Sequence, residues 1–387
     1  MRFTLNCYVV LLALGLLVAC KNNPSTPKNT PSVSEASVDK KHNNYRHFRG
    51  TVGEFPITMD IVETRTLRNN IFDLLHISGF YSYDKYQEPL SLYGSIDEKG
   101  MVELEESGQG TAAGVFKGTL NSDSTFTGIW RDESKKTEYK FSLRQMTNDG
   151  AIALDVYPFE DSLKLFENKP NSPQAEFSLD ALLPAKNTED SLFTFLRTQI
   201  FKTLKGDSLA QDYSNLQLRD IQRTVRDSFF NAYKTELKDE IPDSLSSVML
   251  NHAQSTSMEV VSNTDGLLSL GFQFYTYGGG AHGNHGTQLV TYDIKNKKIL
   301  TLDDVFKPNY KAGLNAAIMR AARRYFGVKP NKSLEGSALV ATVEANDNYA
   351  IGRKGILFQY NPYEIASYAQ GEIQLFVPFE DIKGLLK

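Results

Sequence analysis

Short segments in which apolar and polar residues alternate dominate residues 47–157 and constrain the fold more than any other feature. Residues 115–120 and 126–130 carry large apolar side chains at every second position, and residues 121–124 between them are turn formers. A period of two sends alternate side chains to opposite faces of a strand, and turns this short join antiparallel neighbours. The pattern predicts a small antiparallel β domain, a meander that closes into a sandwich or a barrel.

Helical spacing follows in the second half of the chain. Apolar residues recur at every fourth position over 192–200 and 221–237, and a third amphipathic stretch covers 310–326. Strand-like alternation returns over residues 268–275, 288–294, 355–360 and 372–377. Helices that precede and separate antiparallel strands are typical of the α+β class. We therefore expect a β domain followed by an antiparallel sheet packed with helices.

The N-terminus has the pattern of an export signal. Arg2 precedes an apolar run over 8–19, which is shorter than the roughly 20 residues that a membrane-spanning helix needs. The run ends in Leu-Val-Ala-Cys20, which resembles the cleavage motif of bacterial lipoproteins. The resemblance implies a signal peptide over 1–19 and lipid on Cys20, anchored in a bacterial membrane that we expect to be the outer one. An ordinary signal peptide is the alternative.

Composition divides the rest of the chain. Residues 20–46 are rich in Pro, Ser, Thr, Asn and Lys, which predicts a flexible tether. The formal net charge is −4 and no dense basic run occurs, so nothing predicts nucleic-acid binding. The remaining predicted parts are an all-β domain over 47–157, a proline-marked linker over 158–174, and an α+β domain over 175–387 with a helical module (175–265) and a C-terminal module (266–387).

Residues 275–286 read YTYGGGAHGNHG and are the candidate for chemistry. A phosphate-binding loop has to open a helix, whereas residues 287–292 alternate like a strand. A zinc site needs three or four ligands, and His282 and His285 supply two. The chain has no G-x-S-x-G nucleophile motif. The residues thus predict no catalytic group, no metal and no cofactor, and instead a close-packed loop suited to contact with a protein or a glycan.

We expect this loop to pack against residues 361–368, the other aromatic segment outside the strands. Gly279 and Gly280 would let the two backbones approach closely, and tyrosines would gather at one edge. The predicted binding surface comprises Tyr275, Tyr277, His282, Asn284, His285, Asn361, Tyr363, Glu364 and Tyr368.

Four segments in one order carry a resemblance to a known family. They are residues 274–283, 290–306, 358–371 and 376–379. Together they resemble the C-terminal envelope domain shared by the lysozyme-sensing anti-sigma factor RsiV and the non-catalytic region of the peptidoglycan deacetylase PdaC, over residues 175–387. In RsiV this α+β unit binds lysozyme, and in PdaC a separate metal-dependent domain performs the chemistry. This chain shows none of that domain's Asp/His motifs.

Three hypotheses for function follow. The first is a lipid-anchored envelope protein, not an enzyme, that binds lysozyme or a cell-wall glycan. The second is a hydrolase or deacetylase of the wall glycan that uses His282 and His285. The third is a structural partner of an outer-membrane complex. The sequence leaves the oligomeric state open.

Overall fold

The computed structural model describes residues 43–65, 75–107, 114–132, 134, 136–147, 149–206, 212–213, 215–237 and 247–387. All of them belong to one compact unit, Val38–Lys387. The predicted signal peptide, most of the tether and the lipid site Cys20 lie outside the described residues. The first strand begins at Asn44, inside the predicted tether.

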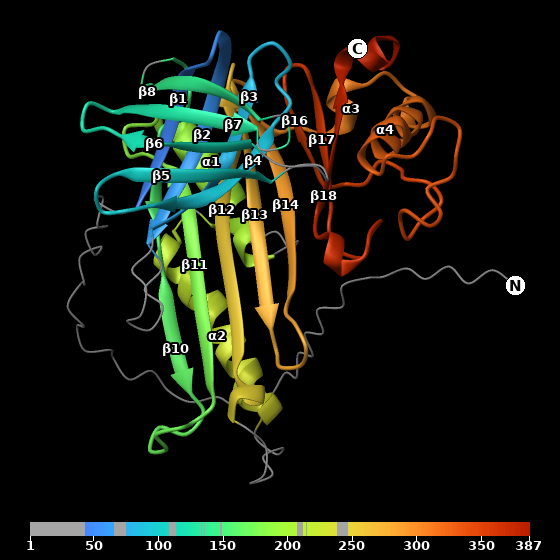
Figure 1. Ribbon diagram of the computed structural model, residues 1–387. Coiled ribbons are helices and arrows are strands. Elements are labelled where there is room, and N and C mark those ends of the chain that lie inside the picture. Colours follow the sequence, from blue (N-terminus) through green and yellow to red (C-terminus); the bar gives the residue numbers. More distant parts are fainter. Residues whose placement is uncertain are drawn as a thin grey trace, which may run out of the picture. The chain divides into compact units, whose positions relative to one another are not determined.

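A closed antiparallel barrel forms the N-terminal part of the described chain (Figure 1). Its strands are β1 (Asn44–Val52), β2 (Phe55–Arg65), β3 (Leu75–Tyr83), β4 (Leu90–Ile96), β5 (Met101–Ser107), β6 (Gly114–Leu120), β7 (Thr125–Asp132) and β8 (Thr137–Gln145). Neighbours pair in sequence order, and β1 closes the ring against β8 with Phe48 opposite Gln145. The alternating apolar side chains fill the interior, among them Phe48, Phe116, Phe126 and Phe141. Of the two predicted alternatives, the barrel is the one that forms.

The second sheet is mixed rather than purely antiparallel. It contains β9 (Leu154–Tyr157), β10 (Glu160–Lys164), β11 (Gln174–Pro184), β12 (His252–Thr264), β13 (Leu267–Tyr277), β14 (Asn284–Asp293) and β15 (Lys298–Ile299). Strands β11 and β12 run parallel, because two helices lie between them in sequence, and the other pairs are antiparallel.

The predicted linker over 158–174 and the domain boundary at 157 are corrected by this sheet. Strand β9 falls on the barrel side of that boundary and β10 falls inside the linker, yet both pair with β11. The prolines that suggested a linker, such as Pro158 and Pro173, stand between strands, where the missing N–H breaks no ladder bond.

Two helices cover one face of this sheet, α1 (Asp190–Lys205) and α2 (Leu218–Leu237), as predicted from the spacing of apolar residues. Leu196 and Ile200 of α1 and Ile221 of α2 are buried in one cluster with sheet residues such as Leu179 and Phe272. The side chain of Glu189 caps α1 by accepting hydrogen bonds from two backbone N–H groups.

The C-terminal residues build a smaller sheet with its own core. Its elements are β16 (Tyr349–Ile351), β17 (Gly355–Tyr360), β18 (Ile373–Pro378), α3 (Leu302–Val305), α4 (Lys311–Tyr325) and the 3₁₀ turns η2 (Tyr368–Gln370) and η3 (Phe379–Leu385); a further turn, η1 (Ser247–Leu250), precedes β12. The predicted helix over 310–326 and the predicted strands over 355–360 and 372–377 are confirmed. These elements pack beside β14 and form one wall of the site described below.

Asparagine side chains join the small sheet to the edge of β14. Asn348 accepts a hydrogen bond from the Leu289 N–H at 2.8 Å and donates to the Thr287 carbonyl at 2.6 Å. Asn361 accepts from the Thr287 N–H at 2.8 Å. These amides replace the hydrogen bonds that a neighbouring strand would make, so the edge of β14 stays satisfied.

We expect Asn348→Ala to lower the free energy of unfolding by about 1–3 kcal/mol, because it leaves two buried backbone groups of β14 without partners. Urea denaturation measures the change. Asn284→Ala, an exposed position on the same strand, is the matched control and should change stability by less than about 0.5 kcal/mol. Equal stabilities for the two variants would show that the amide bridge contributes nothing.

Candidate binding cleft

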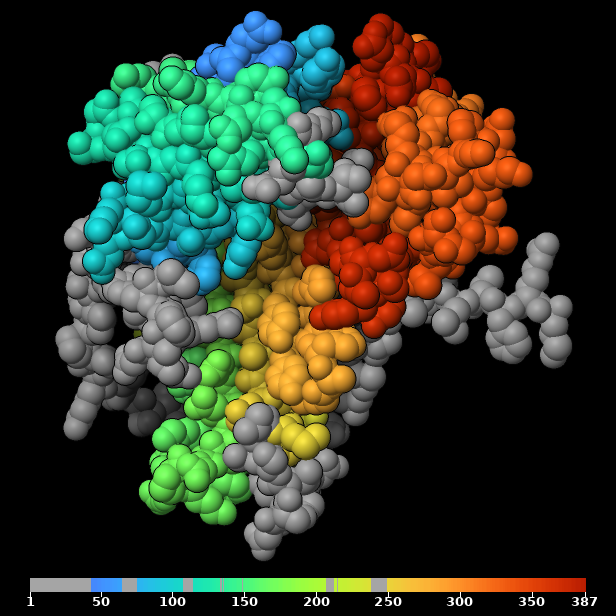
Figure 2. Space-filling model, viewed as in Figure 1, coloured from blue at the N-terminus to red at the C-terminus, as the bar shows by residue number. Residues whose placement is uncertain are grey.

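A cleft of about 960 Å³ lies where the barrel, the main sheet and the small sheet meet. Strands β3 and β4 line it from the barrel, β11 to β14 form its floor, and the segment leading into β18 forms another wall. Figure 2 shows the barrel, in blue to green, adjoining the C-terminal residues in orange and red. An apolar cluster that includes Phe80, Val261 and Phe376 joins the three parts beside the cleft.

The floor is polar because of strand alternation. Residues Leu179, Met258 and Phe272 are packed in the core beneath the helices, so their neighbours in sequence face the other way. The strand register places one residue from each of β11 to β14 in a row: Asp180, Ser257, Gln273 and Thr287. A second row holds Ser178, Ser255, Tyr275 and His285.

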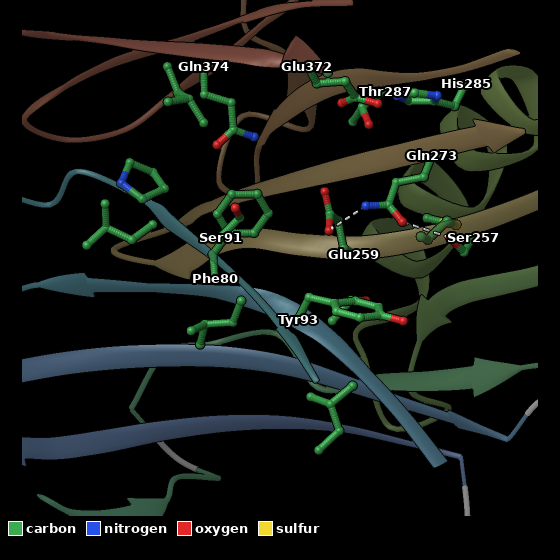
Figure 3. A pocket seen from close by; sticks show the side chains of 18 of the residues that line it. Phe80, Ser91, Tyr93, Ser257, Glu259, Gln273, His285, Thr287, Glu372 and Gln374 are labelled. Carbon is green, nitrogen blue, oxygen red and sulfur yellow. Dashed lines mark hydrogen bonds between the residues drawn. The ribbon is translucent and has the colours of Figure 1, made fainter. Parts of the chain in front are cut away.

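Hydrogen bonds organise the centre of the floor. Ser257 Oγ donates to Gln273 Oε1 at 3.0 Å, and Gln273 Nε2 donates to Glu259 Oε2 at 3.0 Å. On the wall, Glu372 accepts a hydrogen bond from Gln359 Nε2. Figure 3 shows Glu259, Gln273 and Ser257 between Glu372 on one side and Tyr93 on the other.

Burial shifts the ionisation of the carboxyl groups in the cleft. Loss of hydration, together with the charge of Glu372, raises the pKa of Glu259 to about 8. Burial and the charge of Glu160 raise the pKa of Asp180 to about 7. Burial also raises the pKa of Glu372, against opposing hydrogen bonds from Thr287 and Gln359 and the charge of His285. Near neutral pH the floor therefore holds protons on groups that are normally ionised.

The glycine-histidine loop packs against residues 361–368, in agreement with the sequence-based expectation. The ring of His282 stacks on Tyr368 with centroids 4.1 Å apart, and Tyr368 OH donates to the Gly283 carbonyl at 2.8 Å. The glycine that allows this approach is not one of the predicted pair. A Cβ on Gly286 would lie 3.1 Å from the Asn361 amide. A Cβ on Gly283 would instead lie 2.5 Å from the ring of Tyr275 on β13.

Gly279 and Gly280 have other roles. Both adopt positive φ, at 85° and 91°, which favours glycine in this turn. A Cβ on Gly279 would meet the Met249 carbonyl, and one on Gly280 would meet open space. The expectation that these two glycines face residues 361–368 was wrong, because the contact occurs after the turn, where β14 begins.

Of the residues in the predicted binding surface, all of which the structure describes, His285 is the one that lines the cleft. Asn361 holds the backbone of β14, Tyr277 OH donates to the Gly280 carbonyl at 3.1 Å, and Glu364 accepts from Asn346. Asn284 is exposed. The remaining aromatic residues form a group that we name the tyrosine cluster: Tyr275, Tyr363 and Tyr368, with His282.

Sequence reasoning missed the acidic and amide residues of the cleft, Asp180, Glu259, Gln273 and Glu372. The first three belong to the polar phase of alternation on β11 to β13, and a period of two identifies a face without showing what covers it. Glu372 precedes β18 and carries no such signal.

The described residues contain neither a cluster of metal-binding side chains nor a membrane-spanning helix. No group of three or more His, Cys, Asp or Glu side chains is arranged there to hold a metal ion. His282 Nδ1 lies 2.9 Å from the Gly283 carbonyl. None of the helices in the described part of the chain has the length and apolar character to cross a membrane.

Comparison with known proteins finds two family models. One describes a protein of unknown function, DUF3298, and matches residues 303–380; the other, deacetylase PdaC, matches residues 195–285. A curated relative is peptidoglycan-N-acetylmuramic acid deacetylase PdaC of Bacillus subtilis (strain 168), 22% identical over 190 residues. That match covers 49% of this chain and only 38% of the relative, and it falls in the non-catalytic region.

Two solved structures are also similar. A DUF3298 family member from Bacteroides fragilis NCTC 9343 has a TM-score of 0.55 and 22% identity, with 62% of this chain and 96% of that chain covered. A DUF3298 family protein from Pseudomonas aeruginosa PAO1 has a TM-score of 0.46 and 16% identity over the same shares. The first shows the fold. The C-terminal part of this chain is thus a domain of the type that DUF3298 proteins share with the non-catalytic region of PdaC.

Proposed function

We propose that the protein is a lipid-anchored cell-envelope protein, held by Cys20, whose cleft binds a cell-wall glycan. The observation that carries the proposal is the lining of the cleft. Serine, threonine, glutamine and carboxyl side chains from separate strands converge on one space of about 960 Å³. A sugar chain carries a hydroxyl on most of its carbons, so it can give each of these buried polar groups a partner.

An aromatic ring at the same cleft supports this proposal. Tyr93 of β4 lines the cleft with 59% of its surface exposed, and its ring stacks against His76 at 6.4 Å between centroids. A tyrosine offers an apolar face and a polar tip, which matches the apolar face and hydroxyl rim of a pyranose. The ring is therefore suited to pack on a sugar unit while the floor binds its hydroxyls.

The curated relative supports the envelope and the wall as the setting. PdaC is named for its action on peptidoglycan, and this chain resembles the part of PdaC outside the catalytic domain. A non-catalytic region attached to a wall enzyme is well placed to hold the enzyme on its polymer. We extend that role to this chain as binding without catalysis.

The tyrosine cluster favours a second candidate partner, a protein such as lysozyme. Tyr363 is 57% exposed and Tyr275 is 37% exposed, on a surface next to the cleft. Exposed aromatic anchors are enriched where proteins bind each other. Tyr363→Ala should weaken binding of such a protein while leaving glycan binding in the cleft unchanged.

Tyr93→Ala is expected to weaken glycan binding by about 1–2 kcal/mol, within the range of an aromatic anchor. Calorimetry with soluble peptidoglycan oligosaccharides measures it. Tyr86→Ala is the matched control, because Tyr86 is also a barrel tyrosine with 59% exposure but does not line the cleft.

The same samples separate the alternatives. Lysozyme is titrated in parallel, and the oligosaccharides are recovered and analysed for cleavage or loss of acetyl groups. Binding of lysozyme alone would transfer the function to the tyrosine cluster, and turnover that disappears in His282→Ala would establish an enzyme. Absence of any glycan binding would refute the proposed function.

A further inference from the structure

The cleft concentrates carboxyl groups without a matching cation. Asp180, Glu259, Glu372 and Glu88 line it, and none of the described residues that line it is Lys or Arg. The positive charge of Arg324 on α4 opposes the rise in the pKa of Glu88, and that of His285 opposes the rise in the pKa of Glu372. Neither of these two side chains shifts the pKa of the floor residue Glu259.

Two carboxyl groups on the cleft floor, those of Glu259 and Asp180, have no cationic partner among the described residues. Glu259 is 4% exposed, and its partner is the neutral amide of Gln273. Oδ1 of Asp180 is buried and has no hydrogen-bond partner among the described atoms. Buried polar groups in native proteins normally have partners, and carboxylates need a donor or a cation. The unpartnered oxygen of Asp180 and the carboxyl of Glu259, which has no cation beside it, are places where a ligand can supply a donor or a positive charge.

Glu259 and Glu372 face each other across the cleft. Glu259 rises from β12 on the floor, and Glu372 precedes β18 on the wall (Figure 3). Each is held by a glutamine amide, Gln273 for Glu259 and Gln359 for Glu372. A primary ammonium has three N–H donors and can bind two carboxylates together with a hydroxyl such as that of Ser257.

We propose that the cleft selects glycans that carry an unsubstituted amino sugar, with the ammonium group held between Glu259 and Glu372. This inference rests on the proposed function and names the class of glycan. The hydroxyl and amide groups around the two carboxyls, together with the Tyr93 ring, suit the rest of a sugar chain better than a linear polyamine. An N-acetylated unit at the same place would bring a neutral amide, which leaves both carboxyls without a cation.

Binding is coupled to proton release. Burial raises the pKa of both carboxyl groups, and because the pKa of Glu259 rises to about 8, this group holds a proton in the free cleft at mildly acidic and neutral pH. An arriving ammonium stabilises both carboxylates, so protons leave as the ligand binds. The hydrogen-bonding and charged groups beside the pair are Gln273 on β13 for Glu259, and Thr287 and His285 on β14 with Gln359 on β17 for Glu372. The other charged groups at the cleft are Asp180 on β11, Glu88 in the β3–β4 connection and Arg324 on α4.

The test compares two oligosaccharides of one length on the full chain, a β-1,4-linked glucosamine tetrasaccharide and its fully N-acetylated form, with spermine as a third ligand. At mildly acidic pH we expect the amino form to bind about tenfold more tightly than the acetylated form. Calorimetry in two buffers with different ionisation heats should show net proton release for the amino form alone.

Glu259→Gln and Glu372→Gln should each remove most of the preference and reduce the proton release, whereas Glu380→Gln, an exposed acidic position outside the cleft lining, should keep both. Equal affinity for the two tetrasaccharides would overturn the selection and leave glycan binding intact. Binding of neither would refute the proposed function itself. A preference that survives both glutamine variants, or spermine binding as tight as the amino tetrasaccharide, would also overturn the inference.

Discussion

Replacing Asp60 with alanine is expected to lower the free energy of unfolding by about 3–5 kcal/mol, the range for breaking a buried ion pair by removing one partner. Asp60 and His47 are both buried, and His47 Nδ1 lies 2.7 Å from Asp60 Oδ1. Tyr45 OH donates to the same oxygen at 2.6 Å. The alanine would leave the Tyr45 hydroxyl without its acceptor and the imidazolium with only one of its two carboxylates, Asp149, which lies 2.9 Å from His47 Nε2.

This network joins the barrel to the main sheet, which explains why the loss should affect the whole unit. Asn263 of β12 donates to Tyr45 OH at 2.8 Å and also bonds both backbone groups of Ile152. Arg49 donates to Asp149 at 2.8 Å and to Thr264 of β12. Since these bonds fix how β1 lies against β12, they also hold the barrel wall of the cleft in place.

The effect of Asp60→Ala depends on pH in a defined direction. Burial disfavours the His47 imidazolium, but hydrogen bonds and charge attraction from Asp60 and Asp149 outweigh it and raise the pKa of His47. A pKa raised by folding stabilises the folded state below the unfolded value of about 6.5, and this contribution is lost as pH rises through the folded value. The destabilisation should therefore be largest at mildly acidic pH and smaller at alkaline pH.

Urea denaturation of the wild type and Asp60→Ala at several pH values measures this. Glu54→Ala is the matched control, an exposed acidic residue of the same barrel, and should change stability by less than about 0.5 kcal/mol at every pH. Asp60→Asn retains an acceptor for Tyr45 and should fall between the two. A destabilisation by Asp60→Ala that stays constant from acidic to alkaline pH would contradict the charged state of His47.

Local periodicity predicted many of the elements but not all of them, and not all of their pairing. The four-residue spacing from Ile221 to Leu237 predicted α2, and the alternation over 268–275 predicted β13, whereas β11 and β12 were not predicted. The closure of β1 on β8 and the parallel pairing of β11 with β12 join residues far apart in sequence. Alternation identifies which face of each strand is apolar, but it does not determine which distant strand lies alongside.

The cleft illustrates the same limit at the level of function. His282, His285 and the neighbouring tyrosines were predicted as a site because they are close in sequence. Glu259 and Glu372 are more than a hundred residues apart, and each alone is an ordinary polar residue on a strand or before one. What makes them unusual is burial by the barrel and by the small sheet. Burial depends on the tertiary arrangement, so the sequence could not indicate their raised pKa values.

Glu259→Gln is expected to make the protein less sensitive to pH and, near neutrality, more stable. In the wild type, burial raises the pKa of Glu259 from 4.5 to about 8. At pH 7 the folded state must hold a proton that the unfolded state releases. Stability that is fully present below pH 4.5 is thus lost as pH rises towards 8, at about 1.4 kcal/mol per pH unit. By pH 7 this loss is about 3 kcal/mol, and a glutamine does not incur it.

The difference between the stability curves of the wild type and Glu259→Gln isolates this group. Chemical denaturation from pH 4.5 to 8 should show the wild type losing about 3 kcal/mol more than the variant by pH 7. Glu335→Gln, an exposed control, should follow the wild-type curve. Parallel curves for Glu259→Gln and the wild type would mean that Glu259 stays ionised in the folded state. An ammonium ligand would then release no proton from Glu259 on binding, which would contradict the proposed coupling of binding to proton release.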